Sequence, residues 1–106
     1  LDFLDLSIGT FYNLFLVEGS MHTPLAYTVP LSAGMRSVVK LPVFCTNRIN
    51  DPHLAEKILQ DGQADMIGMV RALICDPELP NKSMEGRTEH IRNCSACGSL
   101  PIAGNP

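Results

Sequence analysis

Two arginines follow two short apolar segments of the chain and could bind one anion between them. Arg48 comes shortly after the segment 41–45, and Arg71 comes directly after the segment 66–70. Both segments are almost uniformly apolar, which is typical of parallel strands that are covered on both faces. Because neighbouring parallel strands end at the same edge of a sheet, the two guanidinium groups are expected to face one anion site, most often a phosphate site. The alternative is that both are solvated residues at strand ends.

The stretch between these strands has the pattern of an amphipathic helix. Asp51 can serve as the N-cap, Pro52 fits the first helical position, and Gly62 suits the position just after the helix. Four apolar residues recur at helical spacing, with polar residues opposite them: Leu54, Ala55, Ile58 and Leu59 against Glu56, Lys57, Gln60 and Asp61. The run from 41 to 77 therefore predicts a βαβ unit.

A pair of cysteines near the end of the chain is the second candidate for chemistry. Cys94 and Cys97 have the spacing that can hold two corners of a [4Fe–4S] cluster or half of a zinc site. The alternative is a pair of free thiols, because two thiolates complete neither site. Cys45 and Cys75 lie in or beside predicted buried strands, where a reduced cysteine packs as a small hydrophobic residue. Reduced cysteines favour a cytoplasmic location.

Composition excludes several classes of function. The net charge is −3, and the eight basic residues are scattered singly, so there is no basic stripe for nucleic acid. No apolar run approaches the roughly 18 residues that a membrane span needs. The 106 residues have room for one small domain, and the chain starts at Leu1 without an initiator methionine, so we expect a piece of a larger protein.

Further elements are predicted before and after the βαβ unit. Residues 1–9 read as a strand, 11–30 as a long loop and 31–40 as a helix, the last with one apolar face formed by Leu31, Met35, Val38 and Val39. Asp76 and Pro77 repeat the helix-start signal, and Gly86 closes that short helix. Thr88 is expected to cap one more turn over 88–92. The tail 98–106 has no periodicity and is predicted to be loop or disorder.

The sequences of five segments, which follow one another in the same order as in the family, resemble one branch of the old yellow enzyme superfamily. This is the FMN and iron–sulfur branch, which includes 2,4-dienoyl-CoA reductases and trimethylamine dehydrogenase. The segments are 47–52, 64–71, 76–82, 85–87 and 91–97. The resemblance covers nearly the whole chain. It implies an α/β fold, the C-terminal part of a TIM (β/α)8 barrel, with about three βα units of the eight in a full barrel. Residues 1–97 would supply strands six to eight, parallel and in sequence order, with helices on one face.

The resemblance also assigns residues to the cofactor FMN. In relatives, an Asn-Arg pair after one strand and a residue–Arg pair after the next strand meet the FMN. This implies Asn47, Arg48, Val70 and Arg71 here. Many relatives have glycine at the positions of Asn47 and Val70. A backbone N–H contact survives a side chain there if φ stays negative.

By the same resemblance, Cys94 and Cys97 would be iron–sulfur ligands. The positions where relatives carry a third cysteine hold Leu100 and Pro101, which offer no donor atoms. Cys45 and Cys75 are expected to lie away from the tail and not to substitute. We therefore expect no intact [4Fe–4S] cluster in this chain.

The catalytic residues stay unassigned. Dienoyl-CoA reductases carry a histidine after strand six that helps to protonate the substrate, whereas this chain reads Gly-Thr-Phe-Tyr at 9–12. Tyr12 or His22 could donate a proton, and nothing in the sequence ranks them.

The resemblance predicts a fragment of an FMN-dependent oxidoreductase that uses NAD(P)H and a small-molecule substrate, inactive in isolation. One alternative is a non-catalytic phosphate- or nucleotide-binding half-barrel that self-associates through exposed strand edges. A second alternative is a small metal-binding module built on Cys94 and Cys97.

Overall fold

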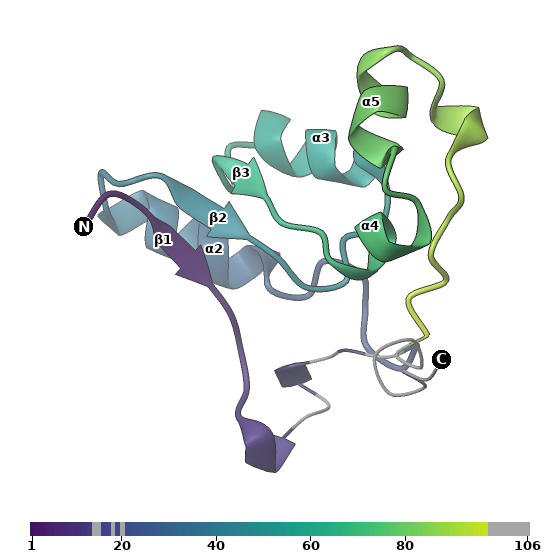
Figure 1. Ribbon diagram of the computed structural model, residues 1–106. Coiled ribbons are helices and arrows are strands. Elements are labelled where there is room, and N and C mark those ends of the chain that lie inside the picture. The colour runs from purple at the N-terminus through teal and green to yellow at the C-terminus, as the bar shows by residue number, and fades with distance from the viewer. Residues whose placement is uncertain (14–15, 18, 20, 98–106) are drawn as a thin grey trace.

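The computed structural model describes residues 1–13, 16–17, 19 and 21–97 (Figure 1). A 3-stranded parallel sheet in the order β1-β2-β3 lies at its centre, with β1 at Leu4–Leu6, β2 at Val43–Cys45 and β3 at Met66–Ile67. Leu4 is paired with Val43, and Phe44 with Met66. The predicted parallel order is confirmed, although each strand is shorter than the apolar run that encodes it. The predicted tail, 98–106, lies outside the described residues.

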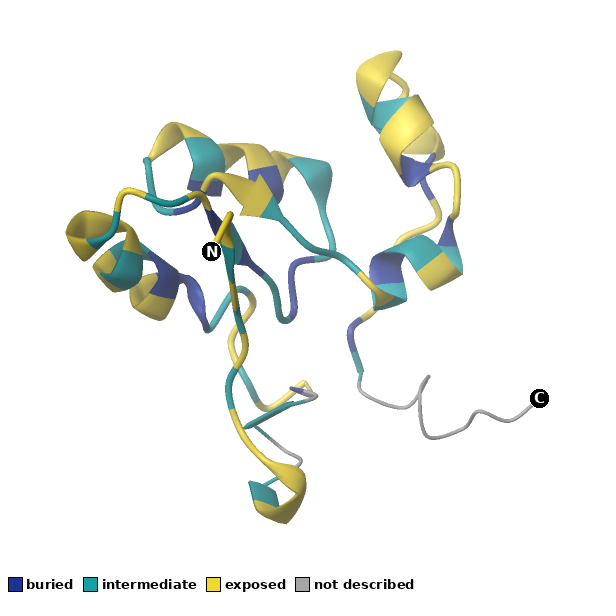
Figure 2. Cartoon of the chain, turned by 60° about the vertical axis from the view of Figure 1, so that its left-hand side comes forward, coloured by how far each residue is buried: buried dark blue, intermediate teal, exposed yellow. Residues whose placement is uncertain are grey.

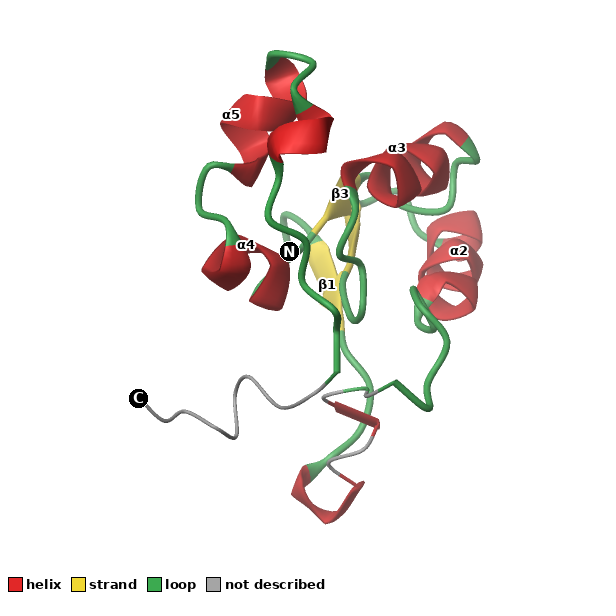
Figure 3. Ribbon diagram, turned by 90° about the vertical axis from the view of Figure 1, so that its right-hand side faces the viewer, coloured by secondary structure: helices red, strands yellow, loops and turns green. Residues whose placement is uncertain are grey.

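Helices follow the strands in alternation. The α-helices are α2 at Val29–Val38, α3 at Pro52–Gln60, α4 at Arg71–Cys75 and α5 at Leu79–Met84, and 3-10 turns occur at Phe11–Asn13 (η1) and Thr88–His90 (η2). Figure 3 shows α2 and α3 together on one side of the sheet, with α4 and α5 apart from them. Helices α2 and α3 thus share one face, as expected, and both make contact with the strands. None of the described helices is long and apolar enough to cross a membrane.

Helix α3 forms as its sequence pattern predicts. The Asp51 carboxylate accepts a hydrogen bond from the Leu54 N–H at 3.3 Å, and Gly62 has a φ of +71° just after the helix. Ile58 is 3% exposed and packs in the main core cluster, which contains Val29, Cys45, Ile49, Ala55, Ile58 and Ala64. This cluster lies between the sheet and the helices α2 and α3.

Helix α2 is rotated relative to the predicted apolar face. It begins at Val29, not Leu31, and it buries Val29 and Ser32, whereas Leu31 is 51% and Val38 77% exposed. Polar contacts at both ends explain the rotation. The buried Thr28 hydroxyl donates to the Thr46 carbonyl, and Arg36, on the same face as Val29 and Ser32, pairs with Asp65 at 3.0 Å.

The sheet is not covered on both faces as the apolar strands suggested. Phe3 and Phe44 stack with ring centroids 4.7 Å apart on the face away from the main core. Phe3 and Met66 on that face are about half exposed. In the described chain, apolar side chains of the open face therefore stay in contact with solvent.

A second, smaller cluster joins the C-terminal elements. It contains Ala72, Leu79 and Ile91, and Met69 packs against both this cluster and the main one. In Figure 2 the buried residues form two groups, one beside the sheet and one around α4 and α5. Met69 is thus a link between two small cores.

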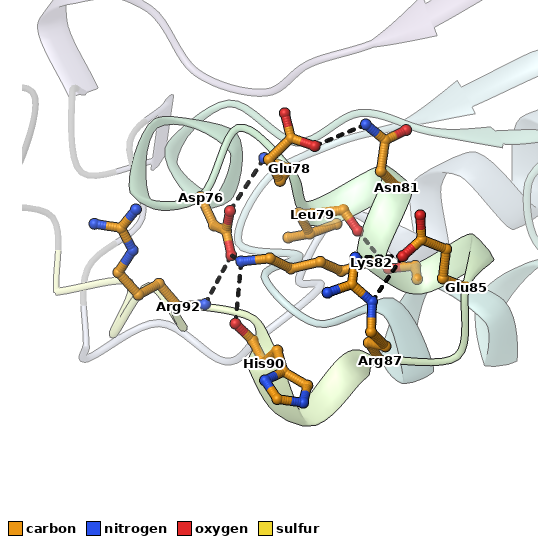
Figure 4. A network of polar contacts seen from close by, with 10 residues as sticks. Asp76, Glu78, Leu79, Asn81, Lys82, Glu85, Arg87, His90 and Arg92 are labelled. Carbon is orange, nitrogen blue, oxygen red and sulfur yellow. Dashed lines mark hydrogen bonds and ion pairs between the residues drawn. The ribbon is translucent and has the colours of Figure 1, made fainter.

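Asp76 organises the polar side of the second cluster (Figure 4). Its Oδ2 accepts hydrogen bonds from Lys82 Nζ at 2.7 Å and the Arg92 N–H at 2.9 Å, and its Oδ1 accepts from the Glu78 N–H at 3.0 Å. The predicted role as N-cap of α5 is therefore wrong, because α5 begins only at Leu79 and Asp76 caps the preceding turn. The predicted Thr88 cap is also absent from the described turn, since η2 has no side-chain cap.

These contacts predict a stability loss at low pH. The hydrogen bond from Lys82, followed by that from the Arg92 N–H, lowers the Asp76 pKa from the ordinary 3.8 to about 2. A carboxyl group whose pKa is lower in the folded state than in the unfolded state stabilises the fold at pH values above its unfolded-state pKa. That contribution is lost as the pH falls from about 4 to about 2. We expect Asp76→Asn to unfold more easily near neutral pH and to lose less further stability across this window than the wild type.

Chemical denaturation at a series of pH values measures the effect. Glu85→Gln is the matched control, because Glu85 pairs with Arg87 on the surface, where both side chains are about half exposed. Equal pH dependence in the wild type and Asp76→Asn would show that Asp76 is not the group responsible.

Candidate functional site

A cavity of about 250 Å³ lies at the carboxyl ends of β2 and β3. The loops that leave these strands, 46–50 and 68–72, form most of its wall, and Ser7, Val17, Cys94 and Ala96 complete it. All four residues predicted to bind FMN (Asn47, Arg48, Val70 and Arg71) line this cavity. The expectation that the two arginines face one cavity at the same end of the sheet is thus confirmed. Their role as FMN ligands stays a prediction.

Arg48 is the more buried of the two charged residues that line this cavity. Its residue is 9% exposed, its Nη1 donates to the Thr23 carbonyl, and its Nη2 donates to the Ala96 carbonyl at 3.0 Å. Its Nε is buried and has no hydrogen-bond partner among the described residues. A buried donor without a partner costs about 1–3 kcal/mol. An anion in the cavity would supply the opposite charge to Arg48 and Arg71, so the charge of the lining fits a phosphate dianion.

Arg71 approaches the cavity from the other loop. It is the first residue of α4, is half-buried, and donates from Nη1 to the Gly19 carbonyl at 3.0 Å. Val70 precedes it with a φ of −104°, so its N–H keeps the geometry that the sequence analysis required.

Asn47 does not meet that requirement. Its φ is +79° and that of Arg48 is +53°, so two successive residues occupy the left-handed region. Asparagine tolerates this region better than most residues, which suits it to this position. The Asn47 amide is used inside the protein, because Nδ2 donates to the Val17 carbonyl at 2.8 Å and to the Tyr27 hydroxyl at 2.9 Å. Asn47 therefore ties the long loop before α2 to the site.

Three features of the site were missed by sequence reasoning. Gly68 lies so close to Thr46 that an added Cβ would be 2.5 Å from the threonine Cγ2, so the wall has no room for a side chain. Asn50 Nδ2 donates to the Cys94 carbonyl at 2.8 Å, as Arg48 does to Ala96. These bonds bring residues 94–96 against the cavity. No local pattern encodes a contact between segments more than 40 residues apart.

The cysteines do not take up the expected arrangement. Burial first, and then hydrogen bonding to the Cys94 thiol, raises the pKa of the Cys75 thiol. The expectation that Cys75 lies away from the tail is therefore wrong, since it ends α4 beside Cys94. The described part of the chain has no group of three or more His, Cys, Asp or Glu residues arranged to hold a metal ion. The donors present do not fit a [4Fe–4S] cluster, which needs four ligands.

The two proton-donor candidates lie away from the cavity. Tyr12 is 99% exposed, His22 is also exposed, and neither is among the residues that line the cavity. The structure thus places no catalytic acid from the sequence analysis at the site.

Comparison with known proteins identifies the family. Residues 17–90 match the model of the NADH:flavin oxidoreductase / NADH oxidase family. The chain belongs to this family. The match includes both arginine loops, and it confirms the resemblance to the old yellow enzyme superfamily that the motifs indicated. The name of the family places a flavin in its chemistry.

Individual relatives of the flavin oxidoreductase family agree with this assignment. A metal reductase of Desulforamulus reducens is 51% identical over 84% of this chain and 13% of its own length. An NADH oxidase of Thermoanaerobacter brockii is 41% identical over 74% of this chain and 12% of its own length. The solved structure of a 2-naphthoyl-CoA reductase with 2-naphthoyl-CoA superposes with a TM-score of 0.75 and 30% identity, over 89% of this chain and 14% of that one. The chain thus spans a small part of the relatives that it matches.

Proposed function

We propose that this chain is the C-terminal part of the FMN-binding TIM barrel of an NAD(P)H-dependent flavin oxidoreductase, of the ene-reductase or amine-dehydrogenase type. The observation that carries the proposal is the placement of Arg48 and Arg71 at one cavity, with the buried Arg48 Nε lacking a partner among the described residues. FMN bound at this site would supply the chemistry of hydride transfer between NAD(P)H and a small-molecule substrate.

The protein's own residues would hold the phosphate end of FMN. Arg48 and Arg71 would give charge-assisted hydrogen bonds, and the backbone N–H group at Val70 would add a neutral one. The hydrogen bonds from Arg48 to the Thr23 and Ala96 carbonyls orient its guanidinium before any ligand arrives. A preoriented donor loses less entropy on binding.

The barrel assignment rests on the parallel sheet and its open face. The order β1-β2-β3 is that of consecutive barrel strands, and the half-exposed Phe3 and Met66 lie on the face that a closed barrel would bury. The rest of the barrel would supply the contacts to the isoalloxazine ring. We therefore expect the isolated chain not to oxidise NAD(P)H, with or without added FMN.

A titration of the chain with FMN and with riboflavin tests the proposal. We expect FMN to bind more tightly than riboflavin, because only FMN carries the phosphate, and inorganic phosphate to compete with FMN. Quenching of flavin fluorescence reports each affinity. Equal affinity for the two flavins, unaffected by phosphate, would contradict a phosphate site between Arg48 and Arg71.

The exposed face also favours a second candidate, a non-catalytic phosphate- or nucleotide-binding half-barrel that self-associates. The carrying observation is the exposed apolar surface of Phe3 and Met66 beside strands with unpaired edges. Sedimentation over a range of concentrations would then show dimers that Met66→Ser weakens. The control Met84→Ser, at an exposed methionine of α5, should have no effect. A monomer at all concentrations would rule this candidate out.

A further inference from the structure

We propose that Tyr27 is a positioning residue of the phosphate site, because its hydroxyl holds the turn that carries Arg48. Tyr27 is half-buried and is not among the residues that line the cavity, so it acts on a ligand only through its neighbours. This role rests on the proposed function, in which Arg48 and Arg71 bind the phosphate of FMN. It adds to that site a residue from behind the cavity wall.

The turn that carries Arg48 needs support from outside itself. Asn47 and Arg48 have φ angles of +79° and +53°. Left-handed backbone is unfavourable for residues with a Cβ, and it persists only where the surrounding contacts enforce it. If such contacts are lost, the turn can relax, and the guanidinium group of Arg48 moves with its backbone. A residue that enforces the turn therefore sets the position of the cation.

The Tyr27 hydroxyl joins this turn to the loop before α2. Its oxygen donates to the Leu16 carbonyl and accepts a hydrogen bond from Asn47 Nδ2 at 2.9 Å. Asn47 Nδ2 also donates to the Val17 carbonyl at 2.8 Å, and Asn47 Oδ1 accepts from the Thr46 hydroxyl at 2.8 Å. The Asn47 side chain is thus fixed at both its nitrogen and its oxygen, and Tyr27 is one of the groups that fix it.

The backbone on either side of Tyr27 binds the same turn. The Ala26 N–H donates to the Arg48 carbonyl at 3.1 Å, and Arg48 Nη1 donates to the Thr23 carbonyl. The segment 23–27 therefore contacts Arg48 at both its backbone and its guanidinium group. Tyr27→Phe removes one oxygen atom and leaves these backbone contacts in place, so this variant isolates the contribution of the hydroxyl.

Titrations of Tyr27→Phe with FMN and with riboflavin test this role. We expect the affinity for FMN to fall about 3- to 10-fold, the range for the loss of one hydrogen bond. The affinity for riboflavin should not change, because riboflavin lacks the phosphate that Arg48 would bind. Tyr12→Phe is the matched control, since it removes the same atom from a tyrosine that is 99% exposed and does not line the cavity. It should leave both affinities unchanged.

A double-mutant cycle with Arg48→Met separates positioning from a general effect on the fold. In the Arg48→Met background, Tyr27→Phe should cause no further loss of FMN affinity, because the group that Tyr27 positions is gone. The same loss with and without Arg48 would overturn the positioning role, since Tyr27 would then act on the chain as a whole. Each variant is first checked for a native circular dichroism spectrum.

Asn47→Gly removes the same hydrogen bond from its other end, and glycine adopts a positive φ without steric cost. If Tyr27→Phe does not fold, this variant decides, and it should lower the affinity for FMN but not for riboflavin. Equal affinity of the wild type for FMN and riboflavin would contradict the phosphate site and the role of Tyr27 together. A wild type that prefers FMN, with the whole preference kept in Tyr27→Phe, would overturn the role of Tyr27 alone.

Discussion

Arg48→Met is expected to weaken FMN binding at least about 30-fold, the largest effect on the proposed function of any single change. The buried guanidinium supplies the charge at the cavity and, at Nε, a donor without a partner among the described residues. Removal of one member of a buried charge pair typically costs about 2–5 kcal/mol. Methionine fills a similar volume, so the cavity wall stays packed while both charge and donors are lost.

Two further variants separate charge from geometry. Arg48→Lys keeps the charge but loses the planar, two-pronged donor, so its affinity should lie between those of the wild type and Arg48→Met. Arg87→Met is the matched control, because Arg87 lies on the surface, pairs with Glu85 and does not line the cavity. Titrations of Arg48→Met, Arg48→Lys and Arg87→Met with FMN and with riboflavin measure the affinity of each variant for the two flavins. Equal loss of affinity for riboflavin and FMN in Arg48→Met would show that the site does not recognise the phosphate.

The sequence predicted the elements whose formation depends on local residues. The α3 stripe around Ile58 and the cap at Asp51 specify a helix with one buried face, and that helix also fixes which ends of β2 and β3 lie together. Once those two strands are parallel, Arg48 and Arg71 must share an edge of the sheet. The cavity between them could therefore be anticipated from the βαβ unit alone.

The sequence could not predict features that depend on distant partners. Helix α2 shows four apolar residues at helical spacing, yet Thr28 and Arg36 contact Thr46 and Asp65 and turn a different face inward. Likewise, the Asp76 carboxylate accepts a hydrogen bond from the Arg92 N–H, 16 positions later, and only the folded chain brings these two residues together. In a small core, a few such polar contacts outweigh an apolar pattern.

Ile58→Ala is expected to destabilise the chain by about 2–5 kcal/mol, the largest stability effect of a single core substitution. Ile58 packs in the main cluster on α3 at 3% exposure, so the truncation leaves a cavity that the rigid sheet cannot refill. A chain of this size buries a smaller share of its surface than a large domain does. The loss is thus a large part of its total stability.

The position of the substitution should decide which part of the chain shows faster hydrogen exchange. Ile91→Ala, in the second cluster, should speed hydrogen exchange mainly in α5 and η2, because Met69 is the residue that packs against both clusters. Ile58→Ala should instead speed exchange throughout the sheet, α2 and α3. Val38→Ala is the matched control, since this β-branched residue of α2 is exposed and its truncation should change stability by no more than about 0.5 kcal/mol. If Ile58→Ala and Ile91→Ala sped hydrogen exchange equally at the same amides, the two clusters would unfold together as one cooperative core joined by Met69.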